Sequence, residues 1–216
     1  MKINNLKKRF FTSLVLFLFL SLIIVSNYLL VFFLLTLGVL SILEFINLTK
    51  RIFKKKLSIL YVSLLFIFYV FTFCYLFYLF SLSYQFKVIL FSLLLGCIAS
   101  DIGGFVFGNV FKGPRLISIS PNKTISGAIG SIILSLFTIP SLIFYLTGYF
   151  DYKIFLVSIS TSIFCQLGDL FFSFLKRKAK LKDTGKIFPG HGGVLDRLDG
   201  IFVGIPFGLL TLIIIV

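Results

Sequence analysis

The chain has 216 residues and a net charge of +14, yet only 13% of its residues are charged and 59% are hydrophobic, including 30 phenylalanines. Soluble domains carry about 25% charged residues, so this composition excludes an ordinary soluble protein and predicts a membrane protein. Nucleic-acid binding is excluded as well, because the basic stripes of nucleic-acid-binding proteins lie on polar surfaces that this chain lacks. The positive charge points instead to anionic lipid or a phosphorylated small molecule.

Seven stretches are long and apolar enough to cross a bilayer, which takes roughly 20 residues. They lie at about 10–26, 28–48, 58–80, 86–108, 126–149, 154–175 and 200–216. Each is expected to be helical, because lipid offers the backbone no other hydrogen-bond partner. No small-residue cleavage site follows the first stretch, so we interpret the first two as a retained hairpin. The prediction is an all-α, polytopic integral membrane bundle that forms a single domain, 1–216.

The basic residues divide unevenly between the loops that alternate along such a bundle. All lysines and arginines except Lys87 and Lys153 fall on the side of the N-terminus. Cytoplasmic loops are enriched in lysine and arginine, so we expect this side to face the cytoplasm across a bacterial-type plasma membrane. Two of its loops, 101–127 and 176–200, combine glycine, proline and charge. The catalytic part is therefore expected in 101–216, with 1–100 contributing hairpin spans.

The loop at 101–127 gives a weak signal of function. Gly104 and Gly108 form a GxxxG pattern, which in membranes marks a close helix contact more often than a ligand site, and which would permit a homodimer. Lys123, in the segment ISPNKTISG, is a candidate phosphate contact. Asp101 opens this loop, and of the acidic residues only Glu44 and Asp151 lie away from the two loops.

A polar stripe runs along the span at 154–175. Helical spacing places Gln166, Asp169, Ser173 and Lys176 on one face of this helix. Hydrogen bonding between helices would by itself explain Gln166 and Ser173. A carboxylate near the membrane interface needs a cation as partner, so Asp169 is the stronger candidate for a functional residue.

The stretch LDRLDG carries Asp196 and Asp199, three residues apart. In a helical first turn their carboxylates point the same way and repel each other unless a cation lies beside them. Mg²⁺ suits this role, because it takes one or two carboxylates and keeps waters and substrate phosphate oxygens as its other ligands. Acidic capping of the last span is the alternative. The intervening Arg197 can bind phosphate through two hydrogen bonds.

Glycines at 190, 192 and 193 surround His191, the only histidine of the chain. Glycine lets the backbone approach a ligand closely and present N–H groups to an anion. A structural histidine in an ordinary turn is the alternative. The cationic residues between 176 and 197 favour a phosphate-rich substrate, although Lys178 and Lys180 are also explained as anchors to anionic lipid.

The run SFLKRKAKLKDTGKIFPGHGGVLDRLD, residues 173–199, closely resembles the signature of the phosphatidate cytidylyltransferase family. Its fixed positions are met by Ser173, Lys176, Arg177, Lys182, Asp183, Gly185, Pro189, His191, Gly192, Gly193, Asp196, Arg197 and Asp199. A looser resemblance, including QLGDL and ISPNKT, extends from about Asp101 to the C-terminus. Relatives often have a glutamate where this chain has Ser126 or Phe172, and an arginine where it has Asn109.

The resemblance implies a membrane enzyme that joins CTP to phosphatidic acid, giving CDP-diacylglycerol and pyrophosphate. It also implies a divalent metal, Mg²⁺ with a second cation permitted, held by Asp169 and Asp196; Asp199 is a third candidate ligand. The expected catalytic set is Asp169, Asp196, Lys176, Arg177, Lys182, Asp183, His191 and Arg197, and the expected substrate-binding set is Lys123, Ser173, Gly192, Gly193 and Asp101. A CTP-dependent kinase of polyprenyl or phytyl alcohols, or a non-enzymatic lipid-binding or transport protein, are the alternatives.

Overall fold

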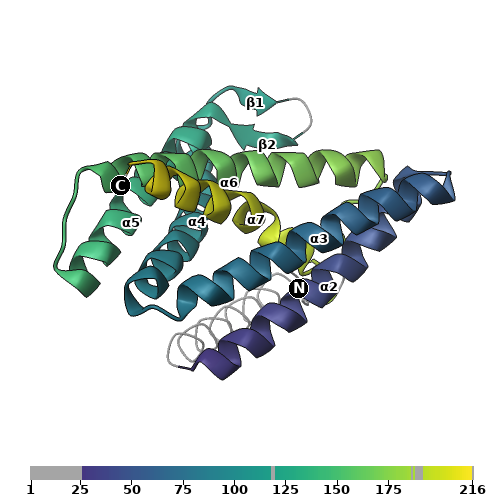
Figure 1. Cartoon of the computed structure of the whole chain (residues 1–216). Coiled ribbons are helices and arrows are strands. Elements are labelled where there is room, and N and C mark those ends of the chain that lie inside the picture. The colour runs from purple at the N-terminus through teal and green to yellow at the C-terminus, as the bar shows by residue number, and fades with distance from the viewer. Residues whose placement is uncertain (1–25, 118–119, 186, 188–191, 216) are drawn as a thin grey trace. The chain divides into compact units, whose positions relative to one another are not determined.

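The computed structural model describes residues 26–117, 120–185, 187 and 192–215, in which helices predominate (Figure 1). The helices are α2 (Asn27–Ile52), α3 (Lys56–Ser81), α4 (Tyr84–Phe111), α5 (Ile125–Thr147), α6 (Lys153–Lys178) and α7 (Leu195–Ile215). Strands β1 (Arg115–Ile117) and β2 (Ser120–Thr124) pair antiparallel between α4 and α5. The 6 helices of this described part are each long and apolar enough to cross a membrane. The chain is therefore an all-α polytopic integral membrane protein.

The predicted spans from 28–48 onward are confirmed, each as a helix that begins or ends within a few residues of the expected position. The span predicted at 10–26 lies outside the described residues. The count of seven spans, and the side of the membrane on which the N-terminus lies, therefore stay predictions.

Both polar loops are shorter than predicted because helices continue into them. Asp101, Gly104 and Gly108 are helical residues of α4, which ends only at Phe111 and is followed by Lys112, where φ is 41°. A glycine and Pro114 follow, and proline cannot continue a helix. The hairpin of β1 and β2 then fills most of the connection, and the sequence did not predict it. The second loop shrinks to 179–194, so Asp196 and Asp199 lie in α7.

The chain divides into two compact units, Met1–Leu82 with Leu175–Leu198, and Ser83–Phe174 with Asp199–Val216. In the first unit α2 and α3 pack as a hairpin. Phe45 stacks on Phe66 with 3.8 Å between ring centroids. One turn further along α2, the hydroxyl of Thr49 lies 3.3 Å from that of Ser63. This seam turns the opposite face of each helix outward.

In the second unit, glycines let α4 and α5 pack closely. A Cβ at Gly103 would overlap the backbone of Gly130, and one at Gly104 would lie 2.8 Å from Oγ of Ser131. Gly108 continues this row against the start of α5. The GxxxG pattern is therefore a helix contact within the chain, as the first of its two interpretations predicted.

The helix α7 meets α6 through a second row of glycines, Gly200, Gly204 and Gly208. A Cβ at Gly200 would lie 2.6 Å from Sγ of Cys165, and one at Gly208 would overlap the hydroxyl of Thr161. Small residues at a spacing of four let two helix backbones approach each other. This contact positions α7, from Asp199 onward, within the second unit.

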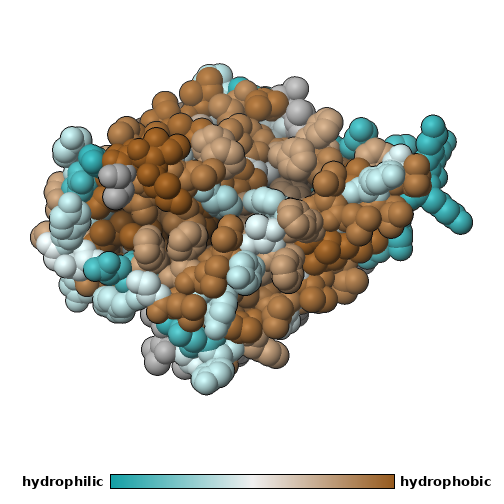
Figure 2. Space-filling view, viewed as in Figure 1, coloured by the Kyte–Doolittle hydropathy of each residue, from teal (hydrophilic) through white to brown (hydrophobic). Residues whose placement is uncertain are grey.

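Large apolar side chains cover much of the outside of the helices. Phe68 and Phe71 on α3 are 71% and 67% exposed, and Phe105 on α4 is 73% exposed. The face seen in Figure 2 is accordingly mostly hydrophobic. Soluble monomers rarely expose apolar patches of this extent, and in a bilayer the same surface contacts lipid.

Candidate functional site

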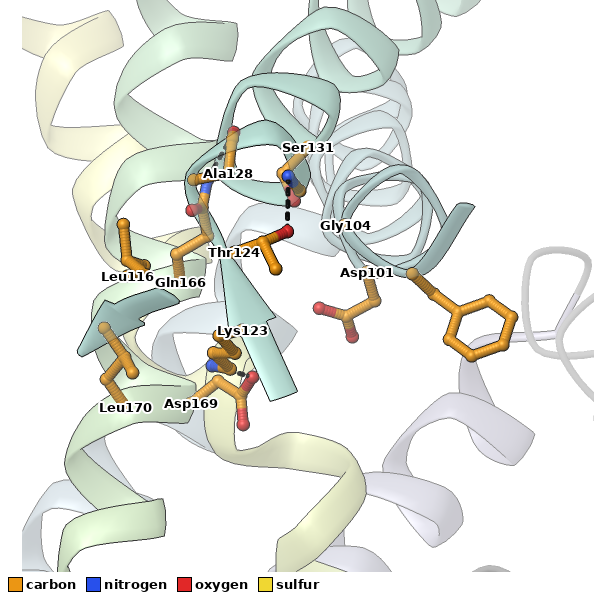
Figure 3. A pocket seen from close by; sticks show the side chains of 12 residues that line it. Asp101, Gly104, Leu116, Lys123, Thr124, Ala128, Ser131, Gln166, Asp169 and Leu170 are labelled. Carbon is orange, nitrogen blue, oxygen red and sulfur yellow. Dashed lines mark hydrogen bonds and ion pairs between the residues drawn. The ribbon is translucent and has the colours of Figure 1, made fainter. Parts of the chain in front are cut away.

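A cavity in the second unit brings together three of the predicted site residues (Figure 3). Asp101 reaches it from α4, Lys123 from β2 and Asp169 from α6, and the cavity measures about 210 Å³. Gln166 and Ser131 add further polar atoms to its wall. We call this cavity the acidic pocket. Two carboxylates and an ammonium group around one opening form an arrangement suited to a charged ligand.

Lys123 and Asp169 form an ion pair across the acidic pocket. Their side chains are 26% and 32% exposed, so both remain accessible from the opening. The expectation that Asp169 needs a cationic partner is thus confirmed, and the partner is Lys123. The roles predicted for the two residues, phosphate contact and metal ligand, stay predictions.

The start of α5 holds β2, and with it Lys123, in place. Thr124 caps the helix, its hydroxyl accepting a hydrogen bond of 3.1 Å from the amide of Gly127. Ser126 lies 3.0 Å from the same hydroxyl and accepts a hydrogen bond of 3.2 Å from the amide of Gly113. Ser126 is a position where relatives often carry glutamate, and here it fastens the hairpin to the helix.

Gln166 belongs to a hydrogen-bonded seam between helices, as predicted. Its amide donates to the carbonyl of Ala128 on α5 at 3.3 Å and to the hydroxyl of Ser162 at 3.4 Å. Phe172, the other position where relatives often have glutamate, is only 4% exposed and lies in the apolar core. These contacts orient α6 so that Asp169 faces the acidic pocket.

The first unit contains the second group of predicted residues, around the connection between α6 and α7. We call this connection, residues 179–194, the signature loop. Asp196, at the start of α7, accepts hydrogen bonds from Nζ of Lys176 at 2.8 Å and from the amides of Thr184 and Gly193 at 2.8 and 2.9 Å. Its side chain is only 7% exposed. Asp196 therefore ties Thr184, inside the loop, to Gly193 near its end, and both to α6.

The other predicted site residues between 173 and 199, which we call the signature region, differ in how exposed their side chains are. Arg177, Lys182, Asp183 and Arg197 are exposed, Ser173 is half-buried, and Lys176 is buried in its contact with Asp196. His191 lies outside the described residues.

Gly192 and Gly193, the two glycines predicted to contact substrate, meet different constraints. Gly192 has a φ of 83°, which disfavours any side chain. The amide of Gly193 is bonded to Asp196 within the chain.

Asp199 is a buried residue of α7 in the second unit, with 7% of its surface exposed. One of its carboxylate oxygens accepts a hydrogen bond of 2.9 Å from the amide of Gly200. The prediction that Asp196 and Asp199 begin a helix is confirmed, with Asp196 in the first turn of α7 and Asp199 just after it. A metal-binding role for Asp199 stays a prediction.

Glu44 is the residue that the sequence interpretation missed. It lies in α2 and is 5% exposed. Its carboxylate accepts hydrogen bonds from the hydroxyl of Thr184 at 2.7 Å and from the amides of Val194 and Leu195 at 3.0 and 2.9 Å. Distance along the chain hid this contact, although an acidic residue inside an apolar span is itself a signal of function.

The acidic pocket fits a divalent cation better than Asp196 does. Carboxylate, amide and hydroxyl oxygens are the hard ligands that Mg²⁺ prefers, and Mg²⁺ usually needs only one or two carboxylates. No three His, Cys, Asp or Glu side chains of the described ranges form a ready-made metal cage. An ionised carboxylate can accept about four hydrogen bonds. Asp196 already accepts three, which leaves little room for a metal ion.

These observations define an integral membrane protein with clustered carboxylate and cationic side chains suited to phosphorylated ligands. Residues 1–215 match the cytidylyltransferase family, and the chain belongs to that family.

Curated relatives carry the name phosphatidate cytidylyltransferase. The protein of Staphylococcus haemolyticus is 41% identical over 129 residues, 59% of this chain and 48% of the relative. That of Helicobacter pylori strain 26695 is 38% identical over 125 residues, 54% of this chain and 44% of the relative. That of Mycobacterium leprae is 37% identical over 127 residues, 57% and 41% respectively. In each alignment the chain spans a little under half of the relative's length.

Proposed function

We propose that this protein is a phosphatidate cytidylyltransferase, which transfers CMP from CTP to phosphatidic acid and yields CDP-diacylglycerol and pyrophosphate. The observation that carries the proposal is the signature region, whose Lys176, Thr184 and Gly193 are gathered around Asp196 in a family member. The names of the relatives supply the substrates. The acidic pocket adds a site of the right chemistry for a phosphorylated ligand.

The reaction needs positioning and charge neutralisation more than it needs a strong base. A phosphate oxygen of phosphatidic acid, largely ionised at neutral pH, attacks the α-phosphorus of CTP. A new phosphorus–oxygen bond forms, the bond between the α- and β-phosphates breaks, and pyrophosphate leaves with the electron pair. Negative charge gathers on the phosphate oxygens, so preorganised cations lower the barrier.

The chain supplies such cations from two places. Lys123 lines the acidic pocket, and we assign it to a phosphate group of the substrate. Arg177, Lys182 and Arg197 are exposed around the signature loop and are assigned to the triphosphate. Asp183 and His191 complete the proposed catalytic set, with Ser173, Gly192 and Asp101 as further substrate contacts.

We assign Mg²⁺ to Asp169 and Asp196, with Asp199 as a third candidate ligand and a second cation permitted. When bound, such an ion would neutralise phosphate charge and help pyrophosphate to leave. The partly exposed side chain of Asp169 supports this role because a ligand can reach it, and Mg²⁺ there would compete with Lys123 for the carboxylate. Binding at Asp196 would compete with Lys176 for the same carboxylate.

The proposed site faces the cytoplasm, where CTP is dissolved, while phosphatidic acid keeps its acyl chains in lipid. The distribution of lysine and arginine along the sequence supports this orientation.

That the protein forms a homodimer stays a prediction. The pattern of Gly104 and Gly108 no longer favours one, because both glycines pack against α5 of the same chain.

Membranes from cells that overproduce the protein test the proposal when they are incubated with phosphatidic acid and CTP labelled at either the α- or the γ-phosphate. A cytidylyltransferase leaves only the α-label on lipid, and a chelator of divalent cations abolishes the product. Transfer of the γ-label would identify a CTP-dependent lipid kinase instead. If neither label reaches lipid above the level of control membranes, the proposed function is wrong.

A further inference from the structure

Glu44 is the only glutamate of the chain, and it is buried in a helix that crosses the membrane. An ionisable side chain at membrane depth costs several kcal/mol and is kept where it has a specific partner. No lysine or arginine of the described ranges forms an ion pair with Glu44. Its partners are instead donors inside the signature loop and at the start of α7. Holding α2 in place does not by itself explain why its buried carboxylate contacts this loop.

Both carboxylate oxygens of Glu44 are used as acceptors. Oε1 accepts from the amide of Val194, and Oε2 accepts from the amide of Leu195 and the hydroxyl of Thr184. The two amides belong to the beginning of α7, whose unpaired N–H groups and dipole favour a negative charge. A residue of α2 thus caps a helix about 150 positions later in the chain.

The loop also closes around the carboxylate sterically. A Cβ at Gly185 or at Gly193 would overlap the oxygens of Glu44. Two glycines eight residues apart in the signature loop therefore lie directly against the same carboxylate. A side chain at either position would push the loop away from α2.

Glu44 and Asp196 act on the same residues of the loop. The hydroxyl of Thr184 donates to Glu44, while its amide donates to Asp196. Gly193 packs against Glu44, while its amide donates to Asp196. The conformation in which Asp196 also binds Lys176 is thus fixed from the side of α2.

We propose that Glu44 is a positioning residue for the signature loop: it holds residues 184–185 and 192–195 in the conformation that binds the triphosphate of CTP. Only the identity of the substrate rests on the proposed function. Without the carboxylate, the loop samples other conformations. The apparent affinity for a phosphorylated ligand is proportional to the fraction of molecules in the binding conformation, so it falls when that fraction falls.

Kinetics of Glu44→Gln test this role. Glutamine puts an NH₂ donor where one backbone N–H needs an acceptor, and hydrogen bonds to charged groups are worth enough to change an equilibrium about tenfold or more. We expect KM for CTP to rise about tenfold or more, with kcat changed less. A general loss of folded protein would instead lower the apparent kcat and leave KM unchanged.

Ser41→Ala is the matched control, because Ser41 is buried on α2 one turn away and, among the described residues, its hydroxyl bonds to the carbonyl of Leu37 and not to the loop. It should leave both kinetic constants near those of the wild type. Thr184→Val removes one partner of the carboxylate, so its effect on KM should add incompletely to that of Glu44→Gln. Fully additive effects, or an unchanged KM in Glu44→Gln, would overturn the proposal.

Hydrogen exchange on the purified full chain tests whether Glu44 holds the signature loop, without any assumption about the substrate. In Glu44→Gln the amides of Val194 and Leu195 should exchange faster, while those of α3 keep the protection seen in Ser41→Ala. Unchanged protection of these two amides would contradict the positioning role of Glu44 even in an active enzyme. Conversely, if these amides exchange faster in Glu44→Gln but the wild-type protein transfers no label to lipid, the positioning role of Glu44 is supported and the proposed function is rejected.

Discussion

Carboxylates with similar sequence signals differ in what surrounds them. Asp169 has a partly exposed side chain paired with Lys123 at the edge of the acidic pocket. Asp196 is almost fully buried and bound by three donors. Glu44, which carried no motif, has as many partners as Asp196. Of these three carboxylates, Asp169 is therefore the most accessible to a ligand.

Replacing Asp169 by asparagine should reduce formation of CDP-diacylglycerol by at least about 100-fold, the usual cost of removing a group that stabilises transition-state charge. The change keeps the size of the side chain but removes its negative charge. The measurement is transfer of α-labelled phosphate to lipid in membranes with equal amounts of protein. Asp151→Asn, at the far end of α6, is the control and should retain activity. Near-normal turnover in Asp169→Asn would remove this residue from the site.

Gly193→Ala should cost activity by more than about tenfold, because the new methyl group overlaps both the carboxylate of Glu44 and the hydroxyl of Thr184. Gly38→Ala on α2 serves as control, since a Cβ there would lie 3.3 Å from Sγ of Cys74, a contact that small shifts relieve. The same lipid-labelling assay compares the two variants. Equal activity in both would show that the close approach of Glu44 to the loop is unimportant.

The helices were the easiest elements to predict, and their ends were the hardest. Hydropathy located α2 to α7 because lipid leaves an apolar stretch of about 20 residues few alternatives to helix. It placed the end of α4 too early, because Asp101 and the glycines after it resemble a loop. Those glycines in fact pack against α5, and the chain turns only at Lys112.

Contacts between distant elements were beyond prediction from one sequence. The pairing of Lys123 with Asp169 depends on a hairpin whose short strands carry no clear alternation. The contact of Glu44 with Val194 joins residues 150 positions apart. Spacing reveals neighbours along a helix, whereas these pairs arise from how helices fold back on one another.

The packing of α4 on α5 predicts the effect of one added methyl group. In Gly103→Ala the new Cβ overlaps the backbone of Gly130, which cannot move aside as a side chain can. Overpacking of this kind costs about 1–3 kcal/mol, so the unfolding temperature in detergent should fall by several degrees. Val106→Ala, at a position of α4 that is 43% exposed, should change it less. A larger loss in Val106→Ala would contradict the close helix contact.

At the scale of the whole molecule, the distribution of charge predicts which side faces the cell interior. Single cysteines replacing Lys54, between α2 and α3, and Tyr149, between α5 and α6, test this in a chain without its native cysteines. A reagent that cannot cross membranes should label the Tyr149→Cys variant in intact cells and the Lys54→Cys variant only in inverted vesicles. The reverse pattern would place the proposed site away from its CTP supply.

Phosphoryl transfer as proposed requires the acidic pocket and the signature loop to act on one substrate, which brings Asp169 and Asp196 together. The most direct measurement is cross-linking of the Asp169→Cys/Asp196→Cys pair by a short bifunctional thiol reagent, in a chain without native cysteines. Trypsin cleaves at the basic residues between the two positions, so a cross-link keeps the two fragments joined. We predict joined fragments for this pair and separate fragments for an Asp151→Cys/Asp196→Cys control. Separate fragments for both pairs would contradict a shared site.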